Sequence, residues 1–140
     1  MCLVSDDIEA IKRLKARYFR TMDTKDWDAY RAVFADDVVM DTSEAGGNVV
    51  EGADAFLEFL VPALSGTVTV HQGHMPEIEL TGDSSATGVW ALQDTIWWPN
   101  GTVMHGYGHY HEPYEKVGDE WKIKSSKLTR LNVLFTERSQ

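Results

Sequence analysis

Long segments in which apolar and polar residues alternate, joined by short turns, fill the second half of the chain. This pattern restricts the fold more than any other feature. The segments cover residues 67–73, 77–80, 86–98, 103–117 and 121–135. Alternation of apolar and polar side chains over such lengths predicts β-strands. Asn100-Gly101 and Gly118-Asp119 separate the last three segments and favour tight hairpin turns. The sequence therefore predicts an antiparallel meander of unusually long strands.

The first half of the chain has helical periodicity instead. Apolar side chains recur at spacings of three and four residues from Ile8 to Met22, which predicts an amphipathic helix with Asp6 as its N-terminal cap. Two further helices are expected over residues 27–34 and 53–60, and a short strand over residues 38–40. Helices followed by a meander are typical of an α+β fold.

A change of phase in the last predicted strand indicates that the sheet is curved. Trp121 and Ile123 share one phase of the alternation, whereas Leu128 has the other, so a bulge is expected near Ser125-Ser126. Long bulged strands make a strongly curved, mostly antiparallel sheet, and helices packed on it leave a pocket between the two layers. A chain of 140 residues is expected to form one such α+β domain over residues 1–140.

Charge and composition exclude several classes of partner. The formal net charge is -9, from 22 acidic and 13 basic residues, which opposes binding to nucleic acid or to an anionic membrane surface. No apolar run approaches the roughly 18 residues of a membrane span. The N-terminus has no basic segment followed by an apolar one, and Cys2 is the single cysteine. We therefore expect a cytoplasmic protein whose partner is a small molecule.

Polar residues interrupt the apolar pattern at a few places. These are Tyr18, Asp23, His71, Asp94 and Arg130. A buried lone charge costs several kcal/mol unless it is paired. Asp23 lies where a helix C-terminus disfavours a carboxylate, and either a turn role or a pairing with His71 would explain it. His71 lies in a predicted strand, and it could equally be a core residue with a structural hydrogen bond or the functional partner of Asp23.

Asp94 shares the parity of the apolar residues around it. Those residues are Trp90, Leu92, Ile96 and Trp98. The carboxylate is therefore expected to point to the same side of the sheet as these side chains. Arg130 lies between apolar neighbours in the last strand and is the natural partner for Asp94. This ion pair could be structural or functional.

Other chemistries have weak sequence support. His109 and His111 have the i, i+2 spacing that places two imidazoles on one face of a strand, where they could bind a metal ion. However, Glu112-Pro113 follow directly, where exposure to solvent is expected. A third metal ligand is not evident in the sequence. The role of His74 stays open in the same way. The chain has neither a glycine-rich phosphate loop after a strand nor a nucleophile elbow. We expect no metal and no cofactor.

Several stretches together resemble the SnoaL-like family of the NTF2-like superfamily. They are residues 8–20 with Asp23 and Trp27-Asp28, then residues 71–78, residues 86–94, and the series Tyr110, Tyr114-Glu115-Lys116, Trp121 and Arg130. The resemblance extends over most of the chain. It implies the cone-shaped fold of that superfamily, with helices on a highly curved sheet around a pocket, and a homo-oligomer, either a dimer or a trimer.

The resemblance also implies a set of site residues. Within the superfamily the pattern is similar to that of bile acid 7α-dehydratase and, in its Asp–His pair, to that of scytalone dehydratase. The implied catalytic residues are His71, Asp23, Tyr18, Asp94 and Arg130, and the expected substrate-binding residues are Trp27, Trp90 and Tyr110. The expected activity is a cofactor-free, dehydratase-like acid/base elimination on a hydrophobic cyclic or polycyclic hydroxylated ketone. A steroid-isomerase-like or polyketide-cyclase-like isomerase is one alternative. A non-catalytic binding module or a dioxygenase-small-subunit-like module is another.

Overall fold

The computed structural model describes residues 4–137, which form three α-helices, a short 3-10 helix and one six-stranded sheet. The elements are α1 (Val4–Asp23), α2 (Trp27–Arg31), β1 (Phe34–Asp41), η1 (Ser43–Ala45), β2 (Val49–Glu51), α3 (Ala53–Ala63), β3 (Val68–Gly82), β4 (Ser85–Trp97), β5 (Thr102–Val117) and β6 (Glu120–Glu137). The strand order is β2-β1-β6-β5-β4-β3, and only the β1–β6 pair is parallel. The predicted α+β fold with a mostly antiparallel sheet is confirmed. Cys2 lies outside the described residues.

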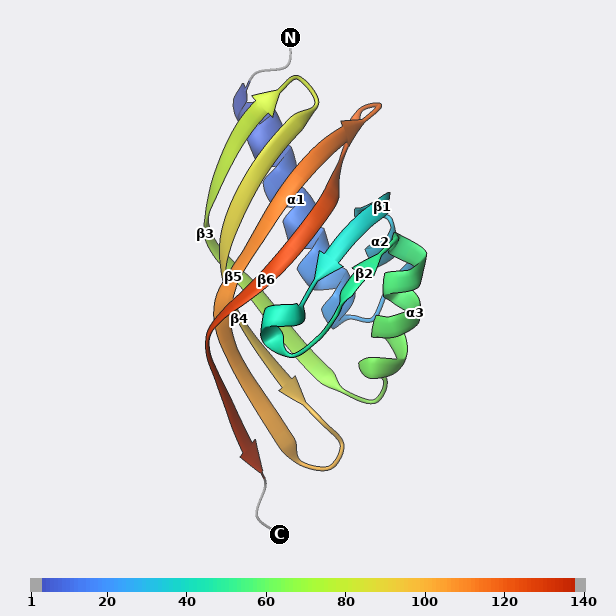
Figure 1. The fold of residues 1–140 in the computed structure, drawn as a ribbon, viewed down its shortest axis with the longest axis vertical. Coiled ribbons are helices and arrows are strands. Elements are labelled where there is room, and N and C mark those ends of the chain that lie inside the picture. Colours follow the sequence, from blue (N-terminus) through green and yellow to red (C-terminus); the bar gives the residue numbers. More distant parts are fainter. Residues whose placement is uncertain (1–3, 138–140) are drawn as a thin grey trace.

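The helix α1 packs along the sheet because one of its faces is apolar (Figure 1). Its core residues are Ile11, Leu14, Tyr18, Phe19 and Met22, which follow the predicted helical spacing. The predicted cap is wrong: α1 already includes Val4, so Asp6 lies in its first turn and not before it. An acidic side chain is still favourable there, at the positive end of the helix dipole.

The segment after α1 differs most from the sequence prediction. The second helix ends at Arg31, and Phe34 is the first residue of β1 rather than part of a helix. The expected short strand over residues 38–40 lies within this longer strand. The third helix continues to Ala63 and includes Pro62 in its last turn. Figure 1 shows α3 beside β1 and β2, where it covers one side of the interior.

The strand β3 (Val68–Gly82) is one strand where two were expected, over residues 67–73 and 77–80. Met75 has a positive φ of 41°, and the β3–β4 register shifts between His74 and Glu77. His74 pairs with Ala91 and Glu77 with Val89, so β3 has one more residue than β4 between these two pairs. The Met75-Pro76 break is therefore a β-bulge, which bends the strand without ending it.

The predicted bulge in the last strand is confirmed. Ile123 pairs with Tyr114 and Lys127 pairs with His111, so β6 has one more residue than β5 over this stretch. A second extra residue in β6 lies opposite the step from Tyr107 to Gly108. These bulges account for the strong bend of the sheet in Figure 1.

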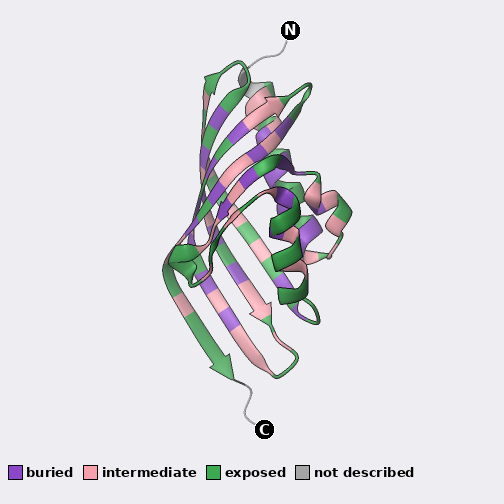
Figure 2. Ribbon diagram, turned by 45° about the vertical axis from the view of Figure 1, so that its right-hand side comes forward, coloured by how far each residue is buried: buried purple, intermediate pink, exposed green. Residues whose placement is uncertain are grey.

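Buried and more exposed residues alternate along the central strands, and the two ends of the sheet differ in how far they are buried (Figure 2). The part of the sheet covered by the helices has a buried inner face, whereas the end of β6 is largely exposed. Exposed large apolar residues in β3–β6 include Val68, Val70, Trp97, Tyr107, Leu131, Leu134 and Phe135. None of the helices among residues 4–137 is long and apolar enough to cross a membrane.

Candidate active site

The carboxylate of Asp23, at the end of α1, contacts His71 in β3. His71 Nδ1 lies 2.7 Å from Asp23 Oδ1, and the His71 backbone N–H donates to Asp23 Oδ2 at 2.8 Å. The Thr69 hydroxyl donates to Oδ1 at 2.9 Å. The predicted contact between Asp23 and His71 is present, and these hydrogen bonds offset the unfavourable position of a carboxylate at a helix C-terminus.

The hydrogen bonding assigns the tautomer of His71. An ionised carboxylate can only accept hydrogen bonds, so Nδ1 carries the proton that is donated to Asp23. The other ring nitrogen, Nε2, is left unprotonated in the neutral imidazole and lies 3.8 Å from Asp94 Oδ2. The His71 side chain is only 8% exposed. The ring is thus held between two carboxylates, with its basic nitrogen away from Asp23.

Asp94 and Arg130 form the opposite side of this arrangement. Arg130 Nη1 and Nη2 donate to Asp94 Oδ1 and Oδ2 at 2.7 and 3.0 Å, a bidentate pair. Burial lowers the pKa of Arg130, but the hydrogen bonds and the charge of Asp94 outweigh it and raise the pKa above its ordinary value. His71 and Asp94 are paired residues in the β3–β4 ladder. The expected inward position of Asp94 is confirmed by its burial.

Gly106 in β5 makes room for the Asp94–Arg130 pair. It is the ladder partner of Asp94, and a Cβ at this position would overlap both the Asp94 carboxylate and the Arg130 guanidinium. A side chain here would therefore push two charged groups out of their bidentate geometry. The pattern of polar residues in the sequence gave no sign of this requirement.

We expect Gly106→Ala to destabilise the protein by about 1–3 kcal/mol, the usual cost of overpacking an interior. Urea unfolding followed by circular dichroism measures this loss. In an Asp94→Ala/Arg130→Ala background the same Gly106→Ala change should cost less, because both side chains that the new methyl group would meet are then absent. A single variant as stable as the wild type would contradict the role assigned to Gly106.

An apolar cavity of about 130 Å³ lies between the helices and the sheet. Of the eight predicted site residues, the structure brings four to the cavity wall: Tyr18, His71, Asp94 and Tyr110. The other wall residues are Met22, Tyr30, Met40, Asp41, Thr42, Phe56, Phe59, Leu60, Leu64, Ile96, Ser126 and Leu128. Asp23 and Arg130 do not line the cavity and instead hold His71 and Asp94.

The two predicted tryptophans lie elsewhere. Trp90 is buried and its Nε1–H donates to the Tyr114 hydroxyl at 2.9 Å. Trp27 packs edge-on against Tyr30, with 5.6 Å between ring centroids. Neither ring belongs to the cavity wall. Trp90 is nevertheless linked to the buried carboxylate of Glu112, because the Tyr114 hydroxyl that accepts from Trp90 donates in turn to Glu112.

Tyr30 belongs to the cavity wall although its chemistry was missed in the sequence. Tyr30 lies in α2, within the helix expected over residues 27–34, and was not among the predicted site residues. Its side chain is 0% exposed. Burial and the neighbouring Tyr18 hydroxyl raise the pKa of Tyr30. Its hydroxyl is therefore a protonated group beside Tyr18, among the residues that line the cavity.

The three cavity tyrosines are packed against one another. Tyr18 lies 5.3 Å from Tyr30 and 5.8 Å from Tyr110 between ring centroids. Burial raises the pKa of all three hydroxyls, and the negative charge of Glu112 raises the pKa of each further. They therefore stay protonated at neutral pH and can act as hydrogen-bond donors.

A buried ion pair, Lys15–Glu112, lies behind the tyrosines. Lys15 Nζ is 2.8 Å from Glu112 Oε2, and both side chains are 0% exposed. Glu112 also accepts from the hydroxyls of Ser126 and Tyr114, at 2.6 and 2.7 Å. The expected exposure of Glu112 is therefore wrong. It shares the parity of the buried residues Tyr110 and Tyr114, a signal that was present in the sequence.

The histidines of β5 do not form a metal site. His109 and His111 lie with their ring centroids 6.3 Å apart, and His111 Nε2 is 3.1 Å from the Thr129 hydroxyl. Among residues 4–137, no three histidine, cysteine, aspartate or glutamate side chains are grouped to hold a metal ion. The titratable side chains that line the cavity are one imidazole, two carboxylates and three phenols.

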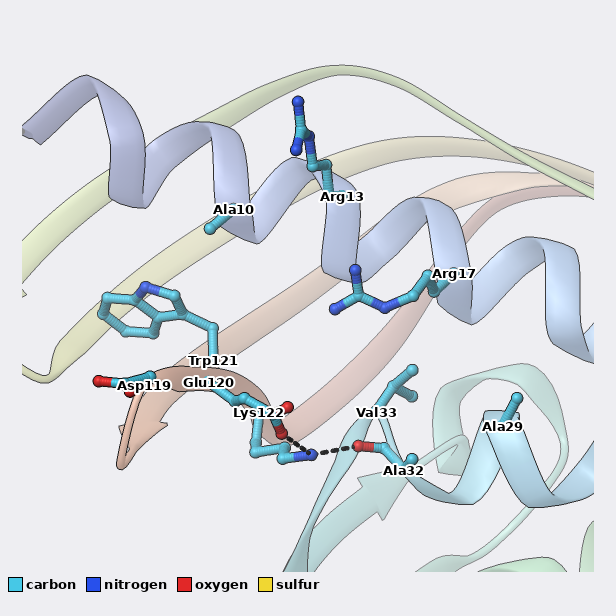
Figure 3. Close-up of a pocket in the computed structure, with 10 residues that line it drawn as sticks. All are labelled: Ala10, Arg13, Arg17, Ala29, Ala32, Val33, Asp119, Glu120, Trp121 and Lys122. Carbon is cyan, nitrogen blue, oxygen red and sulfur yellow. Dashed lines mark hydrogen bonds and ion pairs between the residues drawn. The ribbon is translucent and has the colours of Figure 1, made fainter.

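A second depression, of about 410 Å³, lies on the outside of the molecule (Figure 3). It is lined by Ala10, Arg13, Arg17, Ala29, Ala32, Val33, Asp119, Glu120, Trp121 and Lys122. Lys122 Nζ is already engaged by the Ala32 carbonyl at 2.6 Å and by Glu120 at 3.1 Å. No histidine lines this depression, so its larger volume does not make it the better candidate for acid/base chemistry.

Comparison with known proteins agrees with the fold. The chain is 26% identical over 137 residues to "Probable cyclase FGR4" of Gibberella zeae, covering 86% of this chain and 89% of that protein. A candidate scytalone dehydratase from Novosphingobium aromaticivorans superposes with a TM-score of 0.84 at 20% identity, covering 96% of this chain and 89% of the other. The hexachlorocyclohexane dehydrochlorinase LinA-type3 from Novosphingobium barchaimii has a TM-score of 0.80 at 16% identity, with coverages of 95% and 90%.

The sequence also matches a family model directly. The SnoaL-like domain model aligns with residues 4–127, which include α1, every cavity-lining residue except Leu128, and the Asp23–His71 contact. The structural neighbours have the same arrangement of helices on a curved sheet over nearly their whole length. This chain therefore belongs to the SnoaL-like domain family.

Proposed function

We propose that the protein is a cofactor-free lyase that removes water from a small, hydrophobic, cyclic hydroxylated ketone. The observation that carries this proposal is the placement of His71 on the wall of an apolar cavity, with Nδ1 held by Asp23 at 2.7 Å and Nε2 facing Asp94 at 3.8 Å. An imidazole with one nitrogen bound to a carboxylate is a suitable general base at neutral pH.

In the proposed reaction His71 Nε2 takes a proton from a carbon next to the carbonyl group, or vinylogous to it. The C–H electron pair forms the new double bond, and the hydroxyl group leaves from the neighbouring position. The imidazolium returns the proton to that hydroxyl, so that one molecule of water departs and His71 is regenerated. Asp23 stabilises the imidazolium between the two steps, as the carboxylate does in a catalytic triad.

The remaining cavity residues fit the charge that develops in this reaction. Negative charge moves onto the carbonyl oxygen as the proton leaves carbon, and Tyr18, Tyr30 and Tyr110 are protonated donors on the cavity wall. Donors that are already in place when such charge appears give the largest electrostatic contribution to catalysis. Asp94, fixed by Arg130, is suited to hold the leaving hydroxyl group.

The cavity limits the size of the substrate. A volume of about 130 Å³ is below the roughly 300–1,000 Å³ of pockets that bind drug-sized ligands. Its wall is mainly apolar, with Met22, Phe56 and Leu128 among the residues in contact. We therefore propose a one- or two-ring substrate rather than a steroid.

The direct test is a screen of one- and two-ring hydroxylated ketones with product analysis by mass spectrometry. A lyase yields a product lighter by one water, and in D₂O the remaining substrate gains deuterium at the carbon that loses its proton if that step is reversible. Asp23→Asn is the matched control, because its amide keeps the shape of the carboxylate without its charge. Conversion that is equal in the wild type and in Asp23→Asn would refute the proposed mechanism.

An isomerase or cyclase is the second candidate, favoured by the 26% identity to the cyclase of Gibberella zeae over 86% of this chain. The same base and the same phenol donors would move a proton between two carbons, or initiate ring closure, without expelling water. The screen separates the two classes, because an isomerised product has the mass of its substrate. Binding without any conversion would instead indicate a non-catalytic module.

We further propose that the protein is a homo-oligomer, either a dimer or a trimer. The exposed apolar side chains on β3–β6, such as Val70 and Tyr107, form a surface of the kind that subunit contacts bury. Light scattering at micromolar concentration should give two or three times the 15.8 kDa of the chain. Val70→Asp should shift the mass towards the monomer, whereas a wild type that is already monomeric would contradict the proposal.

A further inference from the structure

The ammonium group of Lys15 lies directly behind two tyrosines of the cavity wall. Its Nζ is 3.7 Å from the ring centroid of Tyr18 and 3.7 Å from that of Tyr110, and 5.1 Å from that of Phe19. Lys15 does not line the cavity itself. The cation therefore lies against the rings of two tyrosines that line the cavity, without lining it itself.

We propose that the buried Lys15–Glu112 pair is a positioning device for the site, in which the ammonium group strengthens Tyr18 and Tyr110 as hydrogen-bond donors to a negatively charged oxygen. This inference rests on the proposed function, because it assigns a purpose to those donors. Lys15 and Glu112 are positioning residues, since neither reaches the cavity.

The surroundings of the ammonium group support this role. An ammonium group has three N–H donors, yet the one hydrogen bond of Lys15 Nζ among the described residues goes to Glu112. Two aromatic ring faces take the place of further oxygen acceptors. A purely structural pair is better satisfied by oxygen atoms around both charges, as Glu112 is by Ser126 and Tyr114.

The direction of the effect follows from electrostatics. A phenol that donates to an oxyanion gains negative charge, and a cation over the face of its ring stabilises that charge. The interior has a low effective dielectric, so the interaction is much stronger than in water. Burial and the Glu112 charge both raise the pKa of Tyr18. The Lys15 ammonium group, 3.7 Å from the Tyr18 ring centroid, carries the charge opposite to that of Glu112, and without it the carboxylate would repel the charge that develops on the substrate.

The pair needs both partners to remain charged in the core. Burial lowers the pKa of Lys15, and the charge and hydrogen bond of Glu112 counteract this. Glu112 is in turn fixed by the hydroxyls of Ser126 and Tyr114. Ser126 itself belongs to the cavity wall, so the network extends from the ammonium group to the cavity.

Binding of phenols tests the inference without any need for turnover. 4-Nitrophenolate carries a negative oxygen on a single ring, and neutral 4-methylphenol has a similar size without the charge. We compare the wild type with Lys15→Met/Glu112→Gln, in which the pair becomes neutral and the glutamine oxygen still accepts hydrogen bonds. The wild type should bind 4-nitrophenolate about tenfold more tightly than the double variant, on the scale of a desolvated cation–π interaction. Binding of 4-methylphenol should differ by less than about twofold.

A double-mutant cycle identifies the route of the effect. In a Tyr18→Phe/Tyr110→Phe background the same change at Lys15 and Glu112 should alter the affinity for 4-nitrophenolate by less than about twofold, because the donors are gone. Equal affinities of the wild type and the folded double variant would overturn the inference. The inference would also be overturned if the affinity for 4-nitrophenolate fell by the same factor in the Tyr18→Phe/Tyr110→Phe background, or if the wild type bound neither phenol. Phenolate selectivity in a protein that converts no ketone would count against the lyase reaction alone.

Discussion

Replacement of His71 by glutamine is expected to reduce turnover by about 10²–10⁴-fold, the usual contribution of a positioned acid/base group. Glutamine fills similar space and can still donate to Asp23, but it cannot take a proton from carbon. The change should therefore reduce kcat, while KM changes little because the cavity keeps its shape. Steady-state kinetics on the best substrate of the screen gives both constants.

His74→Gln is the matched control for this prediction. His74 lies in the same strand, three residues further on, but its side chain is exposed and it pairs with Ala91 rather than with a charged residue. We expect its turnover to stay within about twofold of the wild type, as for other surface substitutions far from a site. Equal kcat values for His71→Gln and the wild type would exclude His71 as the base.

Removal of Lys15 should have the largest effect on stability. Lys15→Met leaves the Glu112 carboxylate buried without its cation, and breaking a buried ion pair in this way typically costs about 3–5 kcal/mol. The expected result is a clearly lower urea midpoint, or a protein that no longer folds. Lys15→Met/Glu112→Gln should recover most of the loss, because no charge is left in the core.

An exposed ion pair provides the comparison. Lys127 Nζ lies 2.9 Å from Glu44 Oε2, with side chains 50% and 52% exposed, and such pairs contribute about 0–1 kcal/mol. Lys127→Met should therefore change the free energy of unfolding by less than about 1 kcal/mol. If Lys15→Met were equally mild, the ion pair with Glu112 would not be the strong core interaction that the geometry indicates.

Much of the fold was predictable because alternation and turn residues act locally. The hairpin pairs at residues 100–101 and 118–119 placed the last three strands correctly, and the change of phase between Ile123 and Leu128 gave the bulge in β6. The same parity argument placed Asp94 on the inner face. These features depend on backbone conformation and side-chain direction over a few residues, which a single sequence records.

The parts that were missed depend on contacts between distant segments. Lys15 and Glu112 are 97 positions apart, and although the parity of Glu112 places it on the inner face, the sequence does not show that its partner is Lys15. The need for a glycine at position 106 could not be predicted, because it arises from two side chains on neighbouring strands. Met75-Pro76 was interpreted as an end of a strand, whereas ladder bonds on both sides of the bulge keep the strand continuous.

The placement of the site within the ladder has a consequence for how related sequences should be compared. His71, Asp94 and Gly106 occupy one transverse row of β3, β4 and β5, while the turns that connect these strands lie outside this row, beyond the ends of the strands. Insertions in those turns lengthen the chain between functional residues and leave the row unchanged. Homologues with the same chemistry should therefore differ freely in the spacing of these residues along the sequence, and an alignment by strand register will find them where a fixed-interval motif would not.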